Sequence, residues 1–411
     1  MTQSVYDIVI IGGGMVGASL AFSLRQKLPS AMTMAVVEAH ELGDRHTGNW
    51  QPSYDDRSTA LSEGTREIFQ ELDLWDKLSE KVEPILDIHV SDRGHFGVTR
   101  LHAKDHNVSA LGYVVENSWL GLVLVEKMMA TEGIDWLCPL QIQNMEPDSD
   151  GMLLETSQKN ASLESGHETL KAKLVILADG GRSRLAGHLG LETSDSDYGQ
   201  TAIVANITPA RHHNNTAYER FTDEGPMALL PRSGGDCALV WTMPTDLAEE
   251  RMQLVEEDFL AELQERFGYR LGRLRKVGER YSYPLILKQA QEQVRPGLVV
   301  LGNAAHSLHP VAGQGFNLSL RDVQVLASVI DKACKDQKNP GELNVLMSYV
   351  DVRQQDQQQT IGFSDRVVRL FSNDSMALAG VRNFGLLGME LVFPAKDWFA
   401  RQAMGLGGVH N

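Results

Sequence analysis

Glycines gather in two segments that lie far apart in the chain. Near the N-terminus, Gly12, Gly14 and Gly17 are spaced as G-x-G-x-x-G. Much later, residues 299–317 read VVLGNAAHSLHPVAGQGFN and combine glycines with two histidines and a proline. Glycine lets the backbone come close to a ligand, because no Cβ intervenes. The chain therefore carries two candidate places for the close approach of a ligand.

The N-terminal segment has the features of a dinucleotide-binding turn. Val5–Ile11 and Met34–Val37 predict short buried strands, and Met15–Leu28 between them predicts a helix. In this arrangement the three glycines permit the tight turn, the approach of a pyrophosphate and close helix–strand packing, and the helix start offers free N–H groups to phosphate. Glu38, at the end of the second strand, can accept hydrogen bonds from a ribose 2′-hydroxyl and would repel a 2′-phosphate.

This fingerprint does not distinguish FAD from NAD, since a nicotinamide dehydrogenase needs only this fold and a catalytic domain. Residues 171–185 (KAKLVILADGGRSRL) repeat the pattern of a strand followed by glycines at Asp179-Gly180. Because G-x-G-x-x-G is absent there, a second phosphate loop and an ordinary Asp-Gly turn are equal alternatives. Arg57, just before a predicted helix, is by spacing alone a solvated surface charge.

The middle of the chain changes in character. Residues 199–284 contain runs that predict antiparallel strands, and residues 86–101 predict a hairpin. A helix is predicted over 247–268, with apolar residues at four-residue spacing: Val255, Phe259, Leu263 and Phe267. This inserted α+β block predicts a substrate domain whose sheet forms one wall of a pocket at the domain interface.

The C-terminal part of the chain predicts helices rich in Phe, Leu and Met. One helix is predicted to bury an apolar stripe of Phe363, Val367, Leu370 and Phe371. Such a stripe favours helices that cap the domain interface. A surface for a greasy substrate or a membrane partner is the alternative.

Composition excludes several classes of function. The net charge is −16, from 38 Lys and Arg against 54 Asp and Glu, which argues against nucleic acid and against attraction to anionic lipid. Cys138, Cys237 and Cys334 are widely separated, so neither a disulfide framework nor a metal site is indicated. No signal peptide and no run long enough to cross a membrane is visible. We therefore expect a cytoplasmic protein without a transmembrane segment.

Together these motifs resemble one family. They are, in chain order, the glycines at 12, 14 and 17 with Glu38, Arg57 behind Asp55, the pair Asp179-Gly180, and GNAAHSLHPVAGQGFN from Gly302 to Asn317. Their order and spacing over the whole chain are similar to the class A flavoprotein monooxygenases, the single-component aromatic hydroxylases of the p-hydroxybenzoate hydroxylase type. IHVSDRGH, YERFTDEGPMALLP and GFSDRVVRLF resemble the ubiquinone-biosynthesis branch of that family.

The resemblance implies an α/β fold. A discontinuous Rossmann-like FAD-binding domain of the glutathione-reductase type would carry an inserted α+β substrate domain and C-terminal helices. The implied limits are 1–80, 105–185 and 285–340 for the FAD-binding domain, 81–104 and 186–284 for the substrate domain, and 341–411 for the C-terminal helical region.

The resemblance also implies which residues bind the nucleotide half of FAD. Gly12, Gly14 and Gly17 would hold the pyrophosphate, and Glu38 the adenosine ribose. The pair Asp179-Gly180 would serve both FAD and a transient NADH or NADPH.

The later segment is implied to bind the flavin half. Arg57 would reach the flavin from a loop that lets the ring swing, and Gly302 and Asn303 would meet the ribityl or pyrophosphate portion. The residues implied to wrap the isoalloxazine are His309, Pro310, Gly313, Gln314, Gly315 and Asn317. The helix that begins near Gly315 would direct its N–H groups at the flavin N1–C2=O edge, where negative charge develops on reduction.

The catalytic base is not identified by sequence. Candidates near the flavin ring and the pocket are His306, His309 and Pro310, although a histidine beside a turn is more often structural. Two residues depart from the family pattern, namely Asn303 in place of the usual Asp and Ala186 where Arg is frequent. Asn303 removes a negative charge beside the diphosphate. The resemblance therefore implies FAD binding more firmly than it implies the individual contacts between this chain and FAD.

The implied activity is aromatic hydroxylation. NADH or NADPH would reduce FAD, and O₂ would form a C4a-hydroperoxyflavin that attacks a polyprenylated methoxyphenol at ring carbon C4. The alternatives are a paralogous hydroxylase acting on another ring carbon, an FAD-dependent reductase or dehydrogenase of the same fold, and a flavin-bearing scaffold. The implied partners are a prenylated phenol, O₂ and a multi-enzyme ubiquinone-biosynthesis complex, with peripheral contact at the inner membrane.

Overall fold

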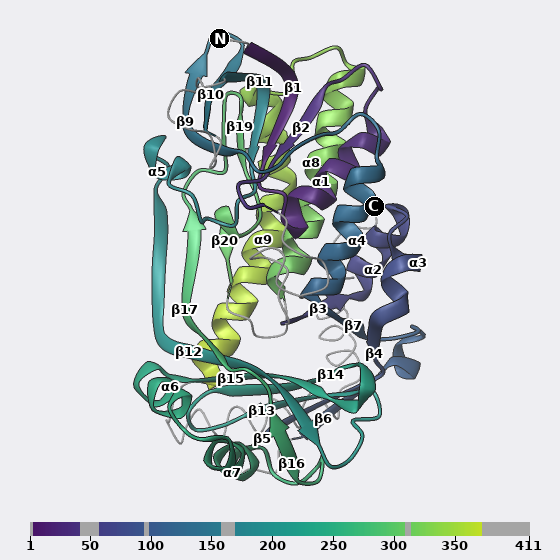
Figure 1. Cartoon of the computed structure of the whole chain (residues 1–411), viewed down its shortest axis with the longest axis vertical. Coiled ribbons are helices and arrows are strands. Elements are labelled where there is room, and N and C mark those ends of the chain that lie inside the picture. The colour runs from purple at the N-terminus through teal and green to yellow at the C-terminus, as the bar shows by residue number, and fades with distance from the viewer. Residues whose placement is uncertain (1–2, 42–56, 94–97, 158–168, 309–313, 372–411) are drawn as a thin grey trace.

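The computed structural model describes residues 3–41, 57–93, 98–157, 169–308 and 314–371. Figure 1 shows two lobes, an upper one built on a mainly parallel sheet and a lower one built on a mainly antiparallel sheet. The long strands β12 and β17 run along one side from the lower lobe toward the upper one. The predicted α/β architecture is therefore present, and the predicted domain limits stay a prediction.

The upper sheet centres on β1 (Gln3–Ile11), which pairs in parallel with β2 and β11. The strand order is β18-β19-β11-β1-β2-β8, and β10 and β9 add an antiparallel extension beside β11. The bounds are β2 Met34–Val37, β8 Asp135–Leu137, β9 Gln141–Asp148, β10 Gly151–Ser157, β11 Thr169–Leu177, β18 Val294–Arg295 and β19 Leu298–Val300. The carboxyl ends of β1, β2 and β11 therefore meet at one edge, which is where ligands of such sheets bind.

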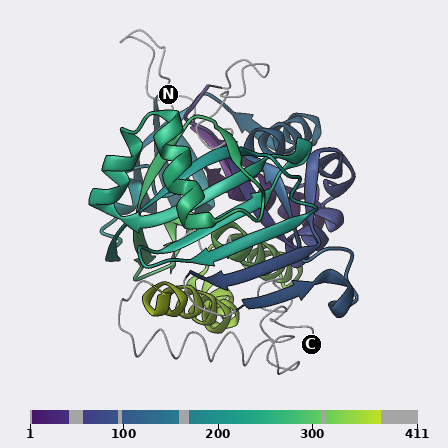
Figure 2. The same ribbon diagram turned by 90° about the horizontal axis from the view of Figure 1, so that it is seen from below.

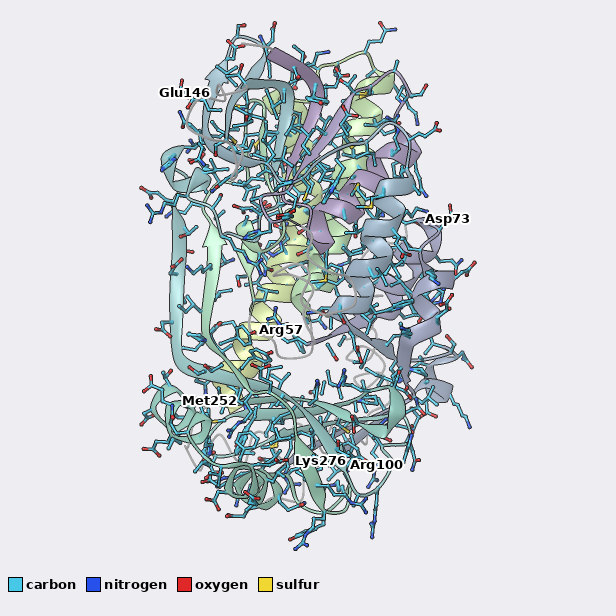
Figure 3. All side chains as sticks on the ribbon, viewed as in Figure 1. Arg57, Asp73, Arg100, Glu146, Met252 and Lys276 are labelled. Carbon is cyan, nitrogen blue, oxygen red and sulfur yellow. The ribbon has the colours of Figure 1, made fainter. Side chains whose placement is uncertain are left out.

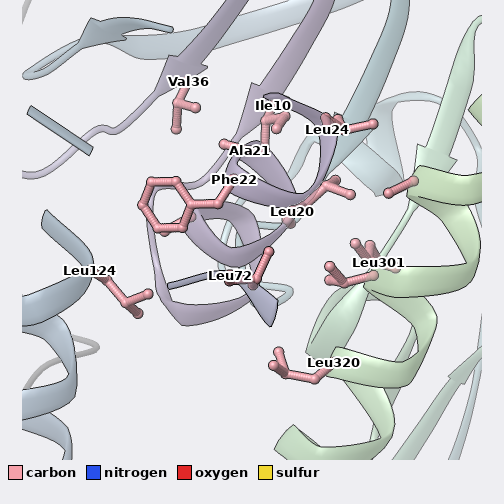
Figure 4. Packing of buried hydrophobic residues seen from close by; sticks show 14 of the residues in the cluster. Ile10, Leu20, Ala21, Phe22, Leu24, Val36, Leu72, Leu124, Leu301 and Leu320 are labelled. Carbon is pink, nitrogen blue, oxygen red and sulfur yellow. The ribbon is translucent and has the colours of Figure 1, made fainter. Parts of the chain in front are cut away.

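Helices cover one face of this sheet. They are α1 (Met15–Lys27), α4 (Asn117–Ala130) and α8 (Gln314–Lys335). Alternate side chains of β1 point to opposite faces, so Ile8 and Ile10 join the helical core, where Ile10 lies near Phe22 of α1 (Figure 4). Val9 and Ile11 point to the other face and pack with residues of β9 and β10. Burial on both faces explains the apolar, β-branched run of β1.

The lower sheet has the order β20-β17-β12-β15-β14-β13-β5-β6, with β16 beside β12. Its pairs are antiparallel except β13 with β5. The bounds are β5 Asp87–Asp92, β6 Val98–His102, β12 Thr193–Pro209, β13 Thr216–Phe221, β14 Pro226–Pro231, β15 Cys237–Pro244, β16 Leu274–Val277, β17 Tyr281–Ala290 and β20 His306–Ser307. The predicted hairpin over 86–101 is β5 and β6.

Two helices, α6 (Thr245–Met252) and α7 (Glu256–Phe267), cover the outer face of the lower sheet (Figure 2). The single helix predicted over 247–268 is wrong, because the chain bends between them and leaves Val255 60% exposed at the N-cap of α7. The bend turns the carbonyls of Arg251 and Leu254 toward Arg280, whose guanidinium donates to both. Three acidic residues in the first turn of α7 favour a new helix start there.

The remaining elements connect the two lobes. A three-stranded sheet, β3-β7-β4, lies beside α2 and α3. The bounds are β3 Ser58–Ser62, β4 Val82–Ile85, β7 Gly112–Glu116, α2 Glu63–Glu71, α3 Trp75–Leu78, α5 Leu185–His188 and α9 Leu343–Phe371. None of the helices in the described part of the chain is both long enough and apolar enough to span a bilayer. The C-terminal helices predicted beyond Phe371 lie outside the described residues.

Candidate functional site

A cavity of about 700 Å³ lies between the two sheets. The described residues that line it come from the β1–α1 turn, the carboxyl ends of β2 and β11, the start of α8 and the inner face of the lower sheet. Figure 3 labels Arg57, which lines this cavity, in the region between the lobes. Clefts of this size at a domain boundary bind small molecules and cofactors.

The β1–α1 turn forms the first end of the cavity. Gly12 has φ +107°, and a Cβ there would lie 2.5 Å from the carbonyl oxygen of Ala178. A Cβ on Gly17 would overlap the carbonyl oxygen of Gly12, so helix and strand can approach only because both residues are glycine. Gly14 is the N-cap of α1 and provides no side-chain cap, which leaves the first N–H groups of the helix open to an anion. This cradle fits the pyrophosphate of FAD.

Glu38 closes the same end of the cavity. Its buried carboxylate accepts hydrogen bonds from the backbone N–H of Gly13 and of His40, both at 2.9 Å. The acid therefore holds the glycine turn as well as facing the cavity. Sequence reasoning overlooked Gly13, where a Cβ would overlap the Trp136 ring.

The Asp179-Gly180 segment is a turn that lines the cavity. Asp179 accepts hydrogen bonds from the backbone N–H of Gly181 and Ser183, both at 2.9 Å, and Gly180 has φ +73°. The Asp side chain thus shapes its own turn, as Asp does in Asx turns. The structure thus forms an Asp-Gly turn at the cavity wall, and a contact of this turn with phosphate stays a prediction. Arg182, which sequence reasoning did not single out, lines the cavity beside it.

The late glycine-rich segment reaches the cavity from the opposite side. Gly302, at φ +67°, lies against Val16 of α1, and both Gly302 and Asn303 line the cavity. Asn317 lines it too, and its Oδ1 accepts hydrogen bonds from the N–H of Ser62 at 2.9 Å and the hydroxyl of Thr65 at 2.7 Å. Asn317 therefore fastens the start of α8 to β3 and α2.

Two of the predicted site residues in this segment lie behind the cavity wall and do not line the cavity. Gln314 is buried and is not among the cavity-lining residues. His306 is also buried behind the wall, and its Nε2 lies 2.7 Å from the Asp322 carboxylate. His309, Pro310 and Gly313 lie outside the described residues.

Arg57 lies over the Tyr283 ring of β17, with its guanidinium carbon 4.8 Å from the ring centre. This cation–π contact places it between the glycine turn and the lower sheet. The predicted site residues that the structure brings to the cavity are Gly12, Gly14, Glu38, Arg57, Asp179, Gly180, Gly302, Asn303, Gly315 and Asn317. Their individual contacts to a cofactor stay predictions.

The lower sheet forms the second end of the cavity. Its inner face is mostly small and aliphatic, lined by Ala202, Val204, Ala217, Ala228, Leu230 and Val240. One carboxylic acid, Glu219 of β13, shares this face, and burial raises the pKa of its carboxyl group above the ordinary value. Sequence reasoning missed Glu219. Its signal is the alternation in AYERF, which puts Glu219 on the same face as Ala217.

Comparisons with known proteins agree with this arrangement. A family model described as "FAD binding domain" matches residues 5–364. Ubiquinone hydroxylase UbiL of Rhodospirillum rubrum is 37% identical over 404 residues, which cover 98% of this chain and 90% of the relative. The 3-demethoxyubiquinol 3-hydroxylase of Escherichia coli is 28% identical over 407 residues, covering 99% of this chain and 100% of the relative. Human COQ6, a mitochondrial ubiquinone biosynthesis monooxygenase, is 27% identical over 444 residues, covering 96% and 92%.

Solved structures share the fold. The p-nitrophenol 4-monooxygenase PnpA of Pseudomonas putida superposes with a TM-score of 0.78 at 18% identity, over 100% of both chains. PqsL of Pseudomonas aeruginosa, described as a probable FAD-dependent monooxygenase, gives 0.76 at 17% identity, over 94% of this chain and 100% of that chain. With the family match over residues 5–364, the chain belongs to the FAD-binding-domain family of class A flavoprotein monooxygenases.

Proposed function

We propose that this chain hydroxylates a polyprenylated methoxyphenol of ubiquinone biosynthesis at ring carbon C4, with NADH or NADPH as the transient reductant. The observation that carries the proposal is one cavity that runs from a pyrophosphate cradle to an aliphatic sheet face. A cofactor at the first end and an aromatic ring at the second would then share one enclosed space. The names of the relatives from Rhodospirillum and human support a substrate of the ubiquinone pathway.

The chain's own residues bind and orient the cofactor. The N–H groups at the start of α1 would bind the pyrophosphate, and the Glu38 carboxylate would accept from the ribose hydroxyl groups. The start of α8, with Gly315 facing the cavity, would offer N–H groups and positive dipole to the flavin ring. When bound, FAD supplies the redox chemistry, in which two electrons from NAD(P)H reduce one oxygen atom of O₂ to water while the other enters the ring.

The inner face of the lower sheet would shape the substrate pocket and exclude water from it. Ala202, Ala217 and Ala228 leave room for a ring, and the aliphatic neighbours exclude water from it. A prenyl chain gains about 0.8 kcal/mol per methylene group on leaving water, which favours peripheral contact with the inner membrane where such substrates partition. The proposed partners are therefore a prenylated phenol and O₂, and the phenol would reach the cavity from the membrane side.

A second candidate is hydroxylation at another ring carbon. The Escherichia coli relative, which covers the whole of this chain's fold, is named for a reaction at ring position 3. Both reactions act on an apolar ring, and the aliphatic residues of the lower sheet suit both equally.

One experiment tests the proposal. The purified holoenzyme is reduced with NADH or NADPH, with and without a methoxyphenol that carries a short prenyl chain, and oxygen labelled with the heavy isotope is then admitted. We expect one labelled oxygen atom in the product, and nuclear magnetic resonance of that product identifies the ring carbon. Reduction of an acceptor without oxygen uptake would support a reductase instead, and absence of nicotinamide-driven flavin bleaching would exclude both enzyme activities.

A further inference from the structure

Glu219 lies in a row of directly opposed residues across the lower sheet. It is opposite Ala228 of β14, Ala228 is opposite Val240 of β15, and Val240 is opposite Val204 of β12. All four residues line the cavity. On its other side, Glu219 is opposite Val90 of β5. The carboxyl group therefore faces the cavity from a row of residues that is otherwise aliphatic.

The Glu219 carboxyl group has no partner within the described part of the chain, where it makes neither a hydrogen bond nor an ion pair. Its residual exposed surface belongs to the cavity wall, and burial alone raises its pKa. A partly buried carboxylate without a partner destabilises a fold, whereas Ala or Val at this position would continue the aliphatic face. A perturbed acid in a cleft is a mark of a functional group, so its ligand is to be sought in the cavity.

The charged groups that share the cavity lie elsewhere on its wall. Glu38, His40, Asp179 and Arg182 belong to the cofactor end. Arg57 is held over the Tyr283 ring. Burial is what raises the pKa of the Glu219 carboxyl group. Glu219 thus supplies the carboxyl group at the aliphatic end of the cavity.

The proposed substrate brings a phenolic hydroxyl group into this end of the cavity. Attack on the ring draws electrons from it, so the hydroxyl proton becomes more acidic as the new carbon–oxygen bond forms. A carboxylate whose pKa is raised is better matched to that proton than an ordinary, solvated carboxylate.

We propose that Glu219 is a catalytic residue that accepts the phenolic proton during hydroxylation, an inference that rests on the proposed function. The substrate O–H bond breaks, its electron pair stays with the phenolic oxygen, and a new O–H bond forms on the Glu219 carboxylate. After oxygen transfer the attacked carbon loses its hydrogen as a proton, which goes to the oxygen atom that leaves as water, and Glu219 returns its own proton to the phenolic oxygen. Glu219 itself is neither oxidised nor reduced, because NAD(P)H and O₂ supply the electrons and the oxygen atom.

The test compares wild-type holoenzyme with Glu219→Gln, Glu219→Asp and the control Glu257→Gln, which alters an exposed carboxylate of α7. For each protein we measure FAD content, the Kd of a singly prenylated methoxyphenol from the change in flavin absorbance, and product formation against pH. We expect Glu219→Gln to retain FAD and to bind the phenol, with product formation lowered about 100-fold. The wild-type rate should rise with pH through the pKa of Glu219, and Glu219→Gln should lose this rise. Glu219→Asp should recover part of the rate, and Glu257→Gln should match wild type.

Product formation by Glu219→Gln at the wild-type rate, with the wild-type pH profile, would overturn the inference and leave the proposed function intact. A wild-type enzyme that makes no hydroxylated product would instead overturn the proposed function. If Glu219→Gln retains no FAD, Glu219→Asp decides. A lowered rate with a displaced pH profile supports the proton-accepting role, and a profile identical to wild type overturns it.

Discussion

Asp322 of α8 is fully buried and Glu219 of β13 is partly buried at the cavity wall, and the two carboxyl groups differ in what surrounds them. The Asp322 carboxylate lies 2.7 Å from His306 Nε2 and 2.6 Å from Arg353 Nε, and it accepts from Gln357 at 3.0 Å. Burial would raise the pKa of Asp322, but hydrogen bonds and charges from His306 and Arg353 outweigh it and hold that pKa below its ordinary value. Glu219 has no such partners, so burial raises its pKa.

Asp322 stabilises the fold through its side-chain partners, whereas the Glu219 carboxyl group faces the cavity, where we propose that it contacts the substrate. Asp322 has a lowered folded pKa, so its stabilising contribution is present above the unfolded pKa of about 3.9 and is lost as pH falls through the folded value. Glu219 has a raised folded pKa, so its contribution is present below the unfolded value of about 4.3 and is lost as pH rises. The two acids therefore oppose each other in the pH dependence of stability.

The largest effect is expected from Asp322→Asn. This change removes one of the two carboxylates that pair with the buried Arg353, since Asp356 remains, and it also removes the charge that pairs with His306. The free energy of unfolding should therefore fall by about 3 kcal/mol. Chemical denaturation of the holoenzyme at neutral pH measures the loss. The control Asp351→Asn, on the exposed side of α9, should stay within about 0.5 kcal/mol of wild type. An equally small effect of Asp322→Asn would remove the distinction between the two acids.

A partner supplied to Glu219 should make it resemble Asp322. In Ala228→Lys the new ammonium group would lie on the neighbouring strand, directly opposite Glu219. A neighbouring opposite charge lowers the pKa of a carboxyl group by about 1–3 units. The infrared band of the protonated Glu219 carboxyl group should disappear at a pH that is lower by that amount, and this measurement needs no bound substrate. Ala228→Met, which fills similar space without charge, is the matched control. A displacement shared by both variants would assign the effect to volume and not to charge.

Stability against pH gives a third, smaller effect. Glu219→Gln cannot ionise, so between the ordinary and the folded pKa of Glu219 it should lose less stability than wild type as pH rises. The difference in slope is at most about 1.4 kcal/mol per pH unit for one proton. Denaturation of both holoenzymes across this range measures it. Parallel curves would mean that Glu219 titrates as an ordinary carboxyl group.

The smallest effect is expected from Asn303→Asp, which introduces a third acid at the cofactor end of the cavity. We expect retained FAD and a flavin midpoint potential that is more negative, on the order of 30 mV, equivalent to about 1.4 kcal/mol for two electrons. Redox titration against a reference dye measures the shift. An unchanged potential would show that the departure at Asn303 has no electrostatic consequence.

Sequence patterns correctly predicted the helices and strands that depend on residues close to one another in the chain. The strand, glycine turn and helix over residues 5–28 match β1 and α1 closely, because β-branched and glycine preferences act within a few residues. The bend between α6 and α7 was missed, since it depends on Arg280, which is distant in sequence. Likewise, His306 beside a turn gave no sign of its pairing with Asp322, which exists only once α8 packs.

Glu219 shows the same limit at the candidate site. Alternation along β13 assigns it to one face of a strand, yet only the register with β14 and β5 decides that this face borders the cavity. The glycine motifs predicted the cofactor end of the cavity, because glycine at these positions meets backbone requirements that can be recognised from the sequence. The substrate end is made by ordinary Ala, Val and Leu residues, which carry no such signal.

Infrared difference spectroscopy of the carboxyl groups can show whether Glu219 is the protonated acid that faces the bound phenol. Wild-type holoenzyme and Glu219→Gln are titrated from acid to neutral pH, with and without the prenylated methoxyphenol. We predict a protonated-carboxyl band in wild type that persists above the ordinary range of Glu, shifts when the phenol binds, and is missing from Glu219→Gln. Identical bands in the two proteins, unaffected by the phenol, would contradict the assignment of Glu219 as the acid that faces the substrate.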